Sequence, residues 1–471
     1  MEKRKFMSNM STTIFSQIFI MLISVILSFL LPKFLSVNNY SLWQVFVFYS
    51  SYTGVFLLGI NDGFIIKNAG KEYKELNKEQ LFLKFCVSFC LELILGVLIF
   101  LFIVVFNIKN RLFIYISLVL YMVFQNSFAL IGSYHQATNN NKLYSKGCIL
   151  ERIVFLLLLL LIALFFNLNE YFYFILFNLL SVFISLVYLY IKSNLKLKIK
   201  FTSLTNELCD VRDDIQVGFK IMLANLSGTL IMGGCRMLID NNWDITIFGK
   251  VSLAISMLQL FLTFVNKAGI VLFPAMKSIS LEKNNEIFKM LYFSLIFITP
   301  LLLLCYFPLK IIIASWLPNY VDSIKYFSIL IIVCIYESKM NLIYSTYLKM
   351  FRMENIYLLF NTISTLMFFI LSILVIFLSL NVNILLLAVI ISLAIRDLLS
   401  GLYILHRINL SSHYQKIEYV YICLYLFLVS MIKNDLIIFL LLLILACIYY
   451  CNLKKEMNYI LSIIKKRRKT I

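Results

Sequence analysis

Charged side chains interrupt several long apolar stretches of this sequence, where an ionised group is costly. Five of them lie near the middle of their stretches: Glu92 in CLELIL, Glu337 and Lys339 in IYESKMN, and Arg396 and Asp397 in AIRDLLS. A charge at the centre of a membrane helix costs about 2.5–3.5 kcal/mol on insertion scales, so each residue is a candidate for pairing or function. Because adjacent residues of a helix do not face each other, Arg396 and Asp397 are expected to pair with other helices.

These deep charges have two possible roles. In the first, they form structural salt bridges between helices, for instance Arg396 with Glu337. In the second, they form a transport site. The cations Lys339 and Arg396 would then hold an anionic group, while the acids Glu92, Glu337 and Asp397 would pair with them or carry coupling protons.

Four further charged residues lie nearer the ends of apolar stretches. Arg236, in MGGCRMLIDNNWD, is about one turn, or about 6 Å, from the end of its stretch. Lys250 and Lys267 lie near opposite ends of the next stretch, and Asp62 follows the second stretch in GINDGF. A long cationic side chain can extend to the interface, so both this role and the lining of an internal cavity stay open. For Asp62 two roles stay open, a turn-forming residue or an acid that carries a coupling proton.

Residues typical of covalent chemistry show no catalytic or metal-binding pattern. The ten cysteines lie mostly inside apolar runs and form no CxxC pair. The sequence contains no HExxH, GxxxxGK[ST] or GxSxG motif. We therefore expect a transport protein rather than an enzyme, with no cofactor and no metal site.

The composition requires a membrane to surround most of the chain. Of 471 residues, 62% are hydrophobic and 14% are charged, with a mean hydropathy of +0.92. This predicts an all-α polytopic membrane protein. A span needs about 20 apolar residues, which predicts fourteen helices, or twelve if the last two do not span. The predicted helices cover 11–31, 42–60, 81–106, 112–133, 147–166, 171–191, 216–239, 245–270, 287–308, 323–348, 356–379, 383–406, 416–432 and 435–451.

The basic residues between these segments predict the orientation. If the N-terminus MEKRKFMSNM is cytoplasmic, the cytoplasmic segments carry 27 Lys and Arg residues and the opposite loops carry 5. Cytoplasmic loops are enriched in such residues, so both termini are expected in the cytoplasm. The net charge of +19 then reflects topology and attraction to membrane lipids, and no nucleic-acid partner is expected.

Two pairs of loops indicate an internal repeat with an offset of six helices. The segments YHQATNNNKLY (134–144) and YLKMFRMENIY (347–357) follow the fourth and tenth helices, and SVNNYSLWQ and IDNNWDITIFGK follow the first and seventh. An even offset predicts two parallel six-helix repeats around a central cavity. The predicted organisation comprises a bundle over 1–191, a cytoplasmic linker over 192–215, a second bundle over 216–408, two additional helices over 409–452 and a basic tail over 453–471.

Several segments resemble the bacterial polysaccharide repeat-unit flippases of the O-antigen type. The stretch NNYSLWQVFVFYSSYTGVFLLGINDG is similar to their second helix and its flanking turns, although Ser41 replaces the usual glycine. The stretch from GFKIMLANLSG to SLAISMLQ is similar to their seventh and eighth helices, with Cys235 at a commonly acidic position, and GIVLFPAMKS resembles the turn that follows. These oligosaccharide-lipid exporters share one exporter superfamily with multidrug extruders and lipid II flippases.

The resemblance implies a specific transport activity. A polyprenyl-pyrophosphate-linked oligosaccharide, such as an O-antigen unit in lipopolysaccharide biosynthesis, would pass from the cytoplasmic to the outer leaflet of the bacterial inner membrane by alternating access. Coupling to protons or sodium ions and association with a polysaccharide polymerase stay open. A cation-coupled multidrug extruder of the same superfamily is the alternative, but the basic candidates favour an anionic substrate. A membrane-bound polymerase or ligase is disfavoured by outer loops under about 20 residues.

Overall fold

The structure is a computed structural model that describes residues 2–69, 71, 73, 75–105, 111–138, 140–165, 169–195, 204–277, 281–351, 353–432 and 434–454. For residues 2–15, 162–165, 204–207, 224, 264, 266–277, 281–284, 349 and 354 the description covers the main chain alone. The secondary structure of the described residues is helical throughout, with no strand, which confirms the predicted fold class.

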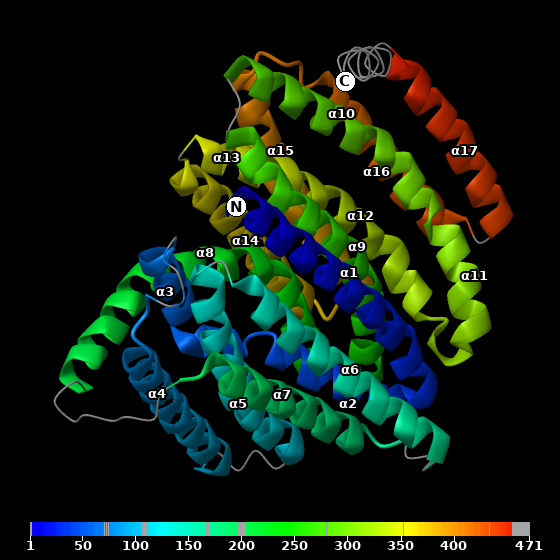
Figure 1. The fold of residues 1–471 in the computed structure, drawn as a ribbon. Coiled ribbons are helices and arrows are strands. Elements are labelled where there is room, and N and C mark those ends of the chain that lie inside the picture. The colour runs from blue at the N-terminus through cyan, green and yellow to red at the C-terminus, as the bar shows by residue number, and fades with distance from the viewer. Residues whose placement is uncertain are drawn as a thin grey trace. The chain divides into compact units, whose positions relative to one another are not determined.

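The predicted spans fall on helical segments (Figure 1), but 42–60 is broken after Ser50 and 287–308 is broken after Leu304. The first eight helices are α1 (Glu2–Phe34), α2 (Val37–Ser50), α3 (Ile60–Asn68), α4 (Lys78–Val105), α5 (Leu112–Ala137), α6 (Asn141–Phe165), α7 (Tyr171–Ser193) and α8 (Leu204–Asn242). The others are α9 (Ile245–Lys277), α10 (Leu281–Leu304), α11 (Tyr306–Trp316), α12 (Ser323–Lys339), α13 (Ser345–Met350), α14 (Glu354–Phe377), α15 (Val382–Arg407), α16 (His413–Met431) and α17 (Asp435–Asn452).

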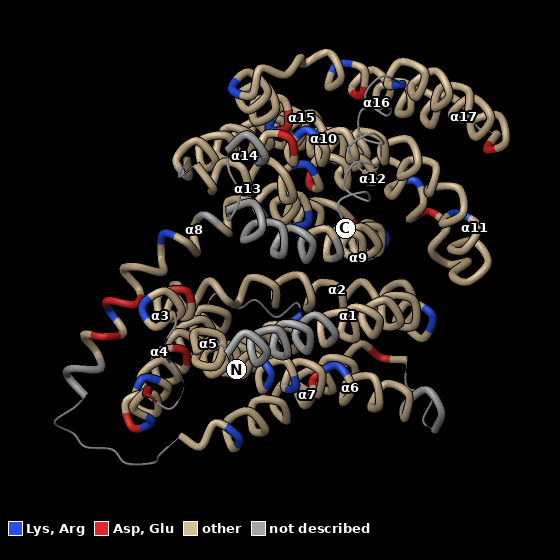
Figure 2. The backbone as a smooth tube through the Cα atoms, turned by 45° about the horizontal axis from the view of Figure 1, so that its top comes forward, with Lys and Arg blue, Asp and Glu red and all other residues tan. Residues whose placement is uncertain are grey.

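Ten helices of the described chain are long and apolar enough to cross a membrane. Two further pairs of helical segments, Val37–Leu57 with Ile60–Asn68 and Leu208–Leu223 with Asn225–Asn242, pass the same criterion when each pair counts as one span. The helices α6 and α16 are outside this set, and both begin with polar turns, NKLYSKGCILER and HYQKIEY. Charged residues are sparse along most helices (Figure 2), and the chain is a multi-pass membrane protein.

The chain divides into two compact units. The N-terminal unit comprises Met1–Leu226 and Asp244–Gly249, and the C-terminal unit comprises Ser227–Trp243 and Lys250–Ile471. Within the N-terminal unit α7 packs against α5 and α6, and α5 also contacts α3 and α4. Within the C-terminal unit α15 packs against α12 and α14, and α10 contacts α12, α16 and α17.

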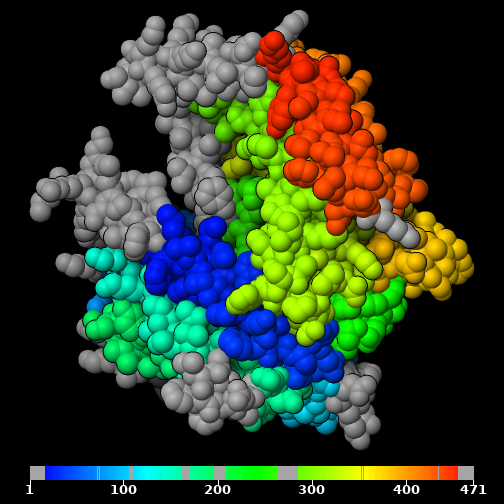
Figure 3. All heavy atoms as spheres, turned by 90° about the vertical axis from the view of Figure 1, so that its right-hand side faces the viewer, coloured from blue at the N-terminus to red at the C-terminus, as the bar shows by residue number. Residues whose placement is uncertain are grey.

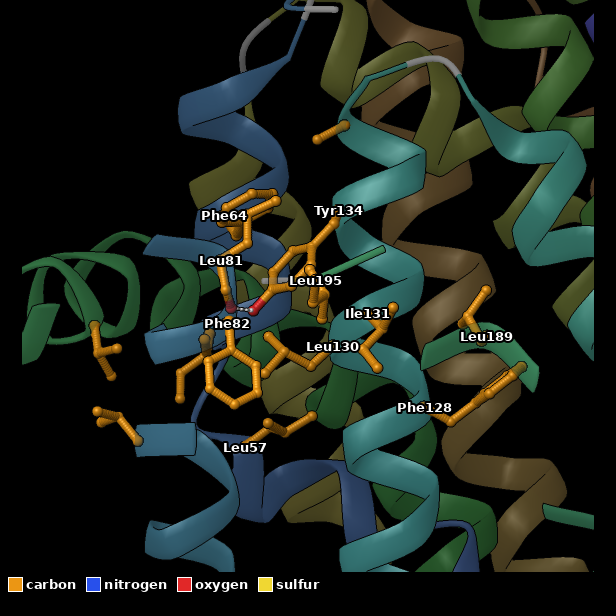
Figure 4. Close-up of a cluster of buried hydrophobic side chains, with 14 of the residues drawn as sticks. Leu57, Phe64, Leu81, Phe82, Phe128, Leu130, Ile131, Tyr134, Leu189 and Leu195 are labelled. Carbon is orange, nitrogen blue, oxygen red and sulfur yellow. Dashed lines mark hydrogen bonds between the residues drawn. The ribbon is translucent and has the colours of Figure 1, made fainter. Parts of the chain in front are cut away.

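A cluster of buried side chains joins the helices of the N-terminal unit (Figure 4). Phe64 of α3 and Tyr134 of α5 are almost completely buried, with ring centroids 4.7 Å apart. The Tyr134 hydroxyl donates to the main-chain oxygen of Leu81 in α4, at 3.3 Å. This bond satisfies a polar group that burial would otherwise leave without a partner.

The first part of α8 packs on α3 through glycines. A Cβ on Gly63 would lie 2.0 Å from the main-chain oxygen of Asp214, and one on Gly218 would lie 1.9 Å from that of Gly59. Gly59 also has a φ of +83°, a conformation that other residues rarely adopt. Glycines one turn apart at the start of α3, together with Gly218 on α8, therefore allow the two backbones to touch.

Part of the predicted cytoplasmic linker 192–215 is helical. The helix α7 ends at Ser193, and α8 begins at Leu204, so the sequence NELCDVRDD is helical. A search for apolar runs misses this part of α8 because its side chains are polar. Its position is held instead by the glycine contacts and by Asp214, which is completely buried.

The last two helices are attached to the C-terminal unit by polar as well as apolar contacts. Figure 3 shows α17, in red, against the yellow-green α10 and α11. The Tyr449 and Tyr450 hydroxyls of α17 donate to the main-chain oxygens of Ile296 and Phe297 in α10, at 3.0 and 2.9 Å. The Tyr425 hydroxyl of α16 donates to a main-chain oxygen of α12 at 3.0 Å.

Candidate functional site

A buried ammonium group between two carboxylates forms the centre of the C-terminal unit's polar network. Lys339 Nζ, at the end of α12, lies 3.0 Å from Asp397 Oδ2 of α15 and 2.6 Å from Glu418 Oε2 of α16. The exposed fractions of the three side chains are 0%, 1% and 0%. Ions shielded from water in this way are retained only when they are paired and hydrogen-bonded.

Neutral groups complete the surroundings of the two carboxylates. The Thr299 hydroxyl of α10 donates to Glu418 Oε1 at 2.8 Å. The Tyr419 hydroxyl donates to Asp397 Oδ2 at 2.7 Å, and Gln415 Nε2 donates to the same oxygen at 3.2 Å. Four helices therefore contribute to one network, which we call the Lys339 cluster.

Local backbone features bring α15 and α16 together at the Lys339 cluster. Gly401 lies one turn after Asp397, and a Cβ there would lie 2.5 Å from Gln415 Nε2. The absence of a side chain at Gly401 allows Gln415 to reach the Asp397 main-chain oxygen at 3.1 Å. On α12 a π-helical turn, Met340–Tyr344, follows Lys339 directly. Such turns insert one extra residue per turn and are frequent at functional sites.

A second buried ion pair lies on the same helices. Arg396 Nη2 is 2.5 Å from Glu337 Oε1, and Arg396 Nη1 donates to Asn361 Oδ1 of α14 at 3.4 Å. The interhelical salt bridge that the sequence left open is therefore present. The prediction that the adjacent residues Arg396 and Asp397 pair with different partners is also confirmed.

The candidates near the helix ends lie apart from this network. Arg236 of α8 is partly buried, and its Nη2 donates to the Ser252 hydroxyl of α9 at 3.0 Å. Lys250 Nζ is 2.7 Å from Asp322 Oδ2, and its hydrogen bond holds the pKa of the Asp322 carboxyl below the ordinary value. The side chain of Lys267 lies outside the described residues.

The two acidic candidates of the N-terminal unit, Asp62 and Glu92, lie on different helices, α3 and α4. Asp62 is partly buried in the first turn of α3. Glu92 of α4 is 3% exposed, and neither carboxylate oxygen has a hydrogen-bond partner among the described residues. Asn126 of α5 lies within interaction range of Glu92 but donates to the Thr53 main-chain oxygen at 3.0 Å. Glu92 therefore differs from the paired acids of the C-terminal unit.

The structure also shows an ion cluster that the sequence did not reveal. Asp214 of α8 accepts a hydrogen bond from Lys84 of α4 at 2.6 Å and forms an ion pair with Lys67 of α3 at 2.9 Å. It lies beside a pocket of about 540 Å³ that Lys71 and Asp210 also line. Asp214 fell in the predicted linker, and Lys67 and Lys84 lie near the ends of their helices, so no deep charge marked this site.

Glu418 was missed for a different reason. It lies in the predicted span 416–432, but within one turn of its start, where a charge usually reaches water. Asp397 was selected because a charge deep in a membrane helix is costly. The same criterion would have selected Glu418 if the predicted span had begun before residue 416. The structure starts α16 at His413, which moves Glu418 into the helix and completely buries it.

Comparisons with known proteins identify the fold. No protein-family model matches the chain, and no characterised protein matches it in sequence. The solved structure of the lipid II flippase MurJ in an inward closed conformation matches with a TM-score of 0.65 and 15% identity, over 98% of this chain and 99% of that chain. An inward-facing multidrug resistance MATE family transporter of the MOP superfamily matches with a TM-score of 0.58 and 15% identity, over 85% of this chain and 99% of its own. The chain thus has the fold of these transporters.

Proposed function

We propose that this protein is a flippase for a lipid-linked oligosaccharide. The substrate class is a polyprenyl-pyrophosphate-linked sugar unit for a surface polysaccharide such as O-antigen, carried from the cytoplasmic to the outer leaflet of the bacterial inner membrane. The proposal places both termini in the cytoplasm, in accordance with the positive-inside rule.

The observation that carries the proposal is the match to the lipid II flippase along 98% of the chain. The MATE transporter covers 85% of the chain. The C-terminal helices α16 and α17 are an integral part of the fold here, because Glu418, Tyr425 and Tyr449 bond to helices earlier in the chain. The longer match to the lipid II flippase favours the lipid-substrate class over the drug-substrate class.

The cationic candidates near the helix ends support an anionic substrate. Arg236 lies near the end of α8 and Lys250 near the start of α9. We propose that Arg236 attracts the pyrophosphate, since a guanidinium binds phosphate oxygens with a planar fork. Lys250 contributes when its ion pair with the exposed Asp322 opens, because an ammonium also binds phosphate oxygens. Lys339 and Arg396 are already paired with buried carboxylates, so we assign them to the supporting network.

The proposal is tested by reconstitution. The purified protein is inserted into vesicles that carry a fluorescent polyprenyl-pyrophosphate oligosaccharide, and a membrane-impermeant quencher reports the fraction in the outer leaflet. We expect protein-dependent equilibration of this lipid, with no effect on a fluorescent phosphatidylcholine control. Export of a cationic dye with no movement of the lipid-linked sugar would instead support the multidrug extruder, the alternative that the MATE match leaves open.

Orientation is tested independently of transport. Reporter fusions after Lys192, Ile270, Arg407 and Ile471 are expected to give cytoplasmic signals with a fluorescent protein and none with alkaline phosphatase. Phosphatase activity after Lys192 would reverse the proposed orientation. Activity only after Ile471 would mean that an odd number of helices crosses the membrane.

A further inference from the structure

The Lys339 cluster contains one more carboxylate than it contains cations. Lys339 supplies one positive charge, and Asp397 and Glu418 supply two negative charges when ionised. The neighbouring pair of Arg396 and Glu337 is neutral by itself. A buried net charge is strongly unfavourable, and two carboxylates that share one site resist double ionisation.

We propose that the Lys339 cluster is a proton-binding site that holds one exchangeable proton on the Asp397–Glu418 pair. Asp397 supports this because its Oδ2 accepts three hydrogen bonds, from Lys339, Tyr419 and Gln415, whereas its buried Oδ1 has no partner among the described residues. Oδ1 is thus an open position for the proton. Protonation there would make the cluster neutral without breaking any of its contacts.

Other buried polar groups around the cluster provide no further charge. The phenols within hydrogen-bonding or electrostatic reach of the two acids are neutral near pH 7. The Tyr292 and Tyr344 hydroxyls are buried without a hydrogen-bond partner among the described residues. They carry no positive charge that would compensate the second carboxylate. These phenols are Tyr292 of α10, Tyr336 of α12, Tyr344 of the π-helical turn, Tyr419 of α16 and Tyr449 of α17.

A proton fits this site better than a metal cation. Lys339 Nζ already occupies the position between the carboxylates, at 3.0 and 2.6 Å. A metal ion next to it would be repelled by the ammonium, and this repulsion is strong where water is excluded. A proton forms a bond with one carboxylate oxygen and needs no coordination shell. The same position would not accept a sodium ion without displacing Lys339.

Release of the proton would affect the attachment of α16. The helix is joined to α10, α12 and α15 through Glu418, Gln415 and Tyr419. Deprotonation would leave an uncompensated charge at this junction, which favours hydration and a looser attachment. If the protein is the proposed flippase, this change gives a proton gradient a means to bias its conformation, and this second step rests on the proposed function.

Infrared spectroscopy tests proton binding without any transport substrate. Protonated carboxyl groups have a carbonyl band that shifts in D₂O, and the folded protein is expected to show such a band that disappears as the pH rises. Asp397→Asn and Glu418→Gln should each remove it, because the remaining carboxylate is neutralised by Lys339. Lys339→Met should increase the band, since both acids then need a proton.

Two further variants assign the band to this site. Glu92→Gln removes the isolated buried acid of the N-terminal unit and should leave the Lys339 cluster's band in place. Glu337→Gln leaves the Arg396 cation beside Asp397 without its carboxylate partner, so the band should disappear at a lower pH. A spectrum that is unchanged in both Asp397→Asn and Glu418→Gln would overturn the proposal. Loss of the band on addition of sodium at constant pH would also overturn it, in favour of a metal site.

A transport assay then tests the proposed flippase function separately from the proton-binding site. In vesicles, a pH difference should change the rate of lipid equilibration several-fold for the native chain and not for Glu418→Gln. If no lipid-linked sugar moves, the proposed function fails, whereas the infrared result for the proton site stands. If the sugar moves at the same rate with and without a pH difference, the site is not coupled to transport.

Discussion

Lys339 of α12 and Glu418 of α16 form a 2.6 Å ion pair in which both side chains are completely buried. The two residues are on helices that begin 90 positions apart, at Ser323 and His413. Their contact shows that α16 is part of the C-terminal unit's core rather than a peripheral addition. It also makes the C-terminal unit's stability dependent on charge balance at one buried point.

The first prediction concerns this charge balance. Lys339→Ala removes the common partner of two buried acids, so we expect a loss of about 3–5 kcal/mol in stability at pH 7. The triple variant with Asp397→Asn and Glu418→Gln should recover a large part of this loss, because no charge of the cluster is then left uncompensated. Thermal unfolding in detergent measures both. Equal losses in the two variants would show that packing, rather than charge, determines the effect.

The second prediction compares two adjacent aspartates. Asp214→Asn removes the buried carboxylate that pairs with both Lys84 and Lys67 and should cost about 3–5 kcal/mol. Asp213→Asn is the matched control, because Asp213 has a 59% exposed side chain 3.8 Å from Lys67 and should cost at most about 1 kcal/mol. Chemical unfolding of the two variants measures the difference. Similar stabilities would mean that Asp214 does not hold α8 to α3 and α4.

The third prediction concerns the contact of α3 with α8. Gly63→Ala places a methyl group 2.0 Å from a main-chain oxygen of Asp214, so the helices must separate. Overpacking of this kind typically costs about 1–3 kcal/mol, and backbone is less able to yield than a side chain. Gly54→Ala is the control, since its Cβ would meet no atom within 4 Å. A Gly63→Ala protein as stable as Gly54→Ala would refute the close contact.

The sequence predicted the helices better than the interactions between them. The apolar runs became helical segments because a chain in lipid must satisfy its own backbone hydrogen bonds, although 42–60 and 287–308 are each broken into more than one segment. The deep charges Lys339, Arg396 and Asp397 were identified by their cost in the membrane, and the pairing of Arg396 with Glu337 was among the interpretations. The polar beginning of α8 has no hydrophobic signal, so its helix and the role of Asp214 were not predicted.

The partners within the site depend on helix rotation, which an apolar run does not define. The predicted span 416–432 places Glu418 within one turn of its start, whereas α16 begins at His413. The contact between Gln415 and Asp397 requires Gly401 on α15, a tertiary relation with no local signature. The predicted six-helix repeat stays a prediction.

The fourth prediction concerns pH. Lys250 lowers the pKa of the Asp322 carboxyl, so the pair stabilises the fold above the unfolded value of about 3.9. This contribution is lost as the pH falls through the lower folded-state pKa. Because Asp322 is 53% exposed, we expect less than about 1 kcal/mol. The stability difference between the native chain and Lys250→Met should therefore vanish at acid pH, and a difference that grows there would contradict the assignment.

The last prediction concerns Arg236, whose Nη2 donates to the Ser252 hydroxyl at 3.0 Å. If this guanidinium attracts the pyrophosphate of the proposed substrate, Arg236→Ala should reduce lipid transfer in vesicles about tenfold or more while the protein inserts and accumulates normally. Arg236→Lys should retain part of the activity, because it keeps the charge and loses the planar fork. Ser252→Ala should have a smaller effect, since it removes one contact of Arg236 and leaves its charge in place.

Lys325→Ala provides a matched control for the loss of a cation, because Lys325 is 77% exposed and lies 3.6 Å from Asp322. It should leave the transfer rate unchanged. If Arg236 is instead an interface anchor, Lys should substitute fully and Ala should reduce the amount of inserted protein together with transfer. Native transfer and native abundance in Arg236→Ala would exclude both roles, because an arginine that only extends toward water can be removed without effect on either measurement.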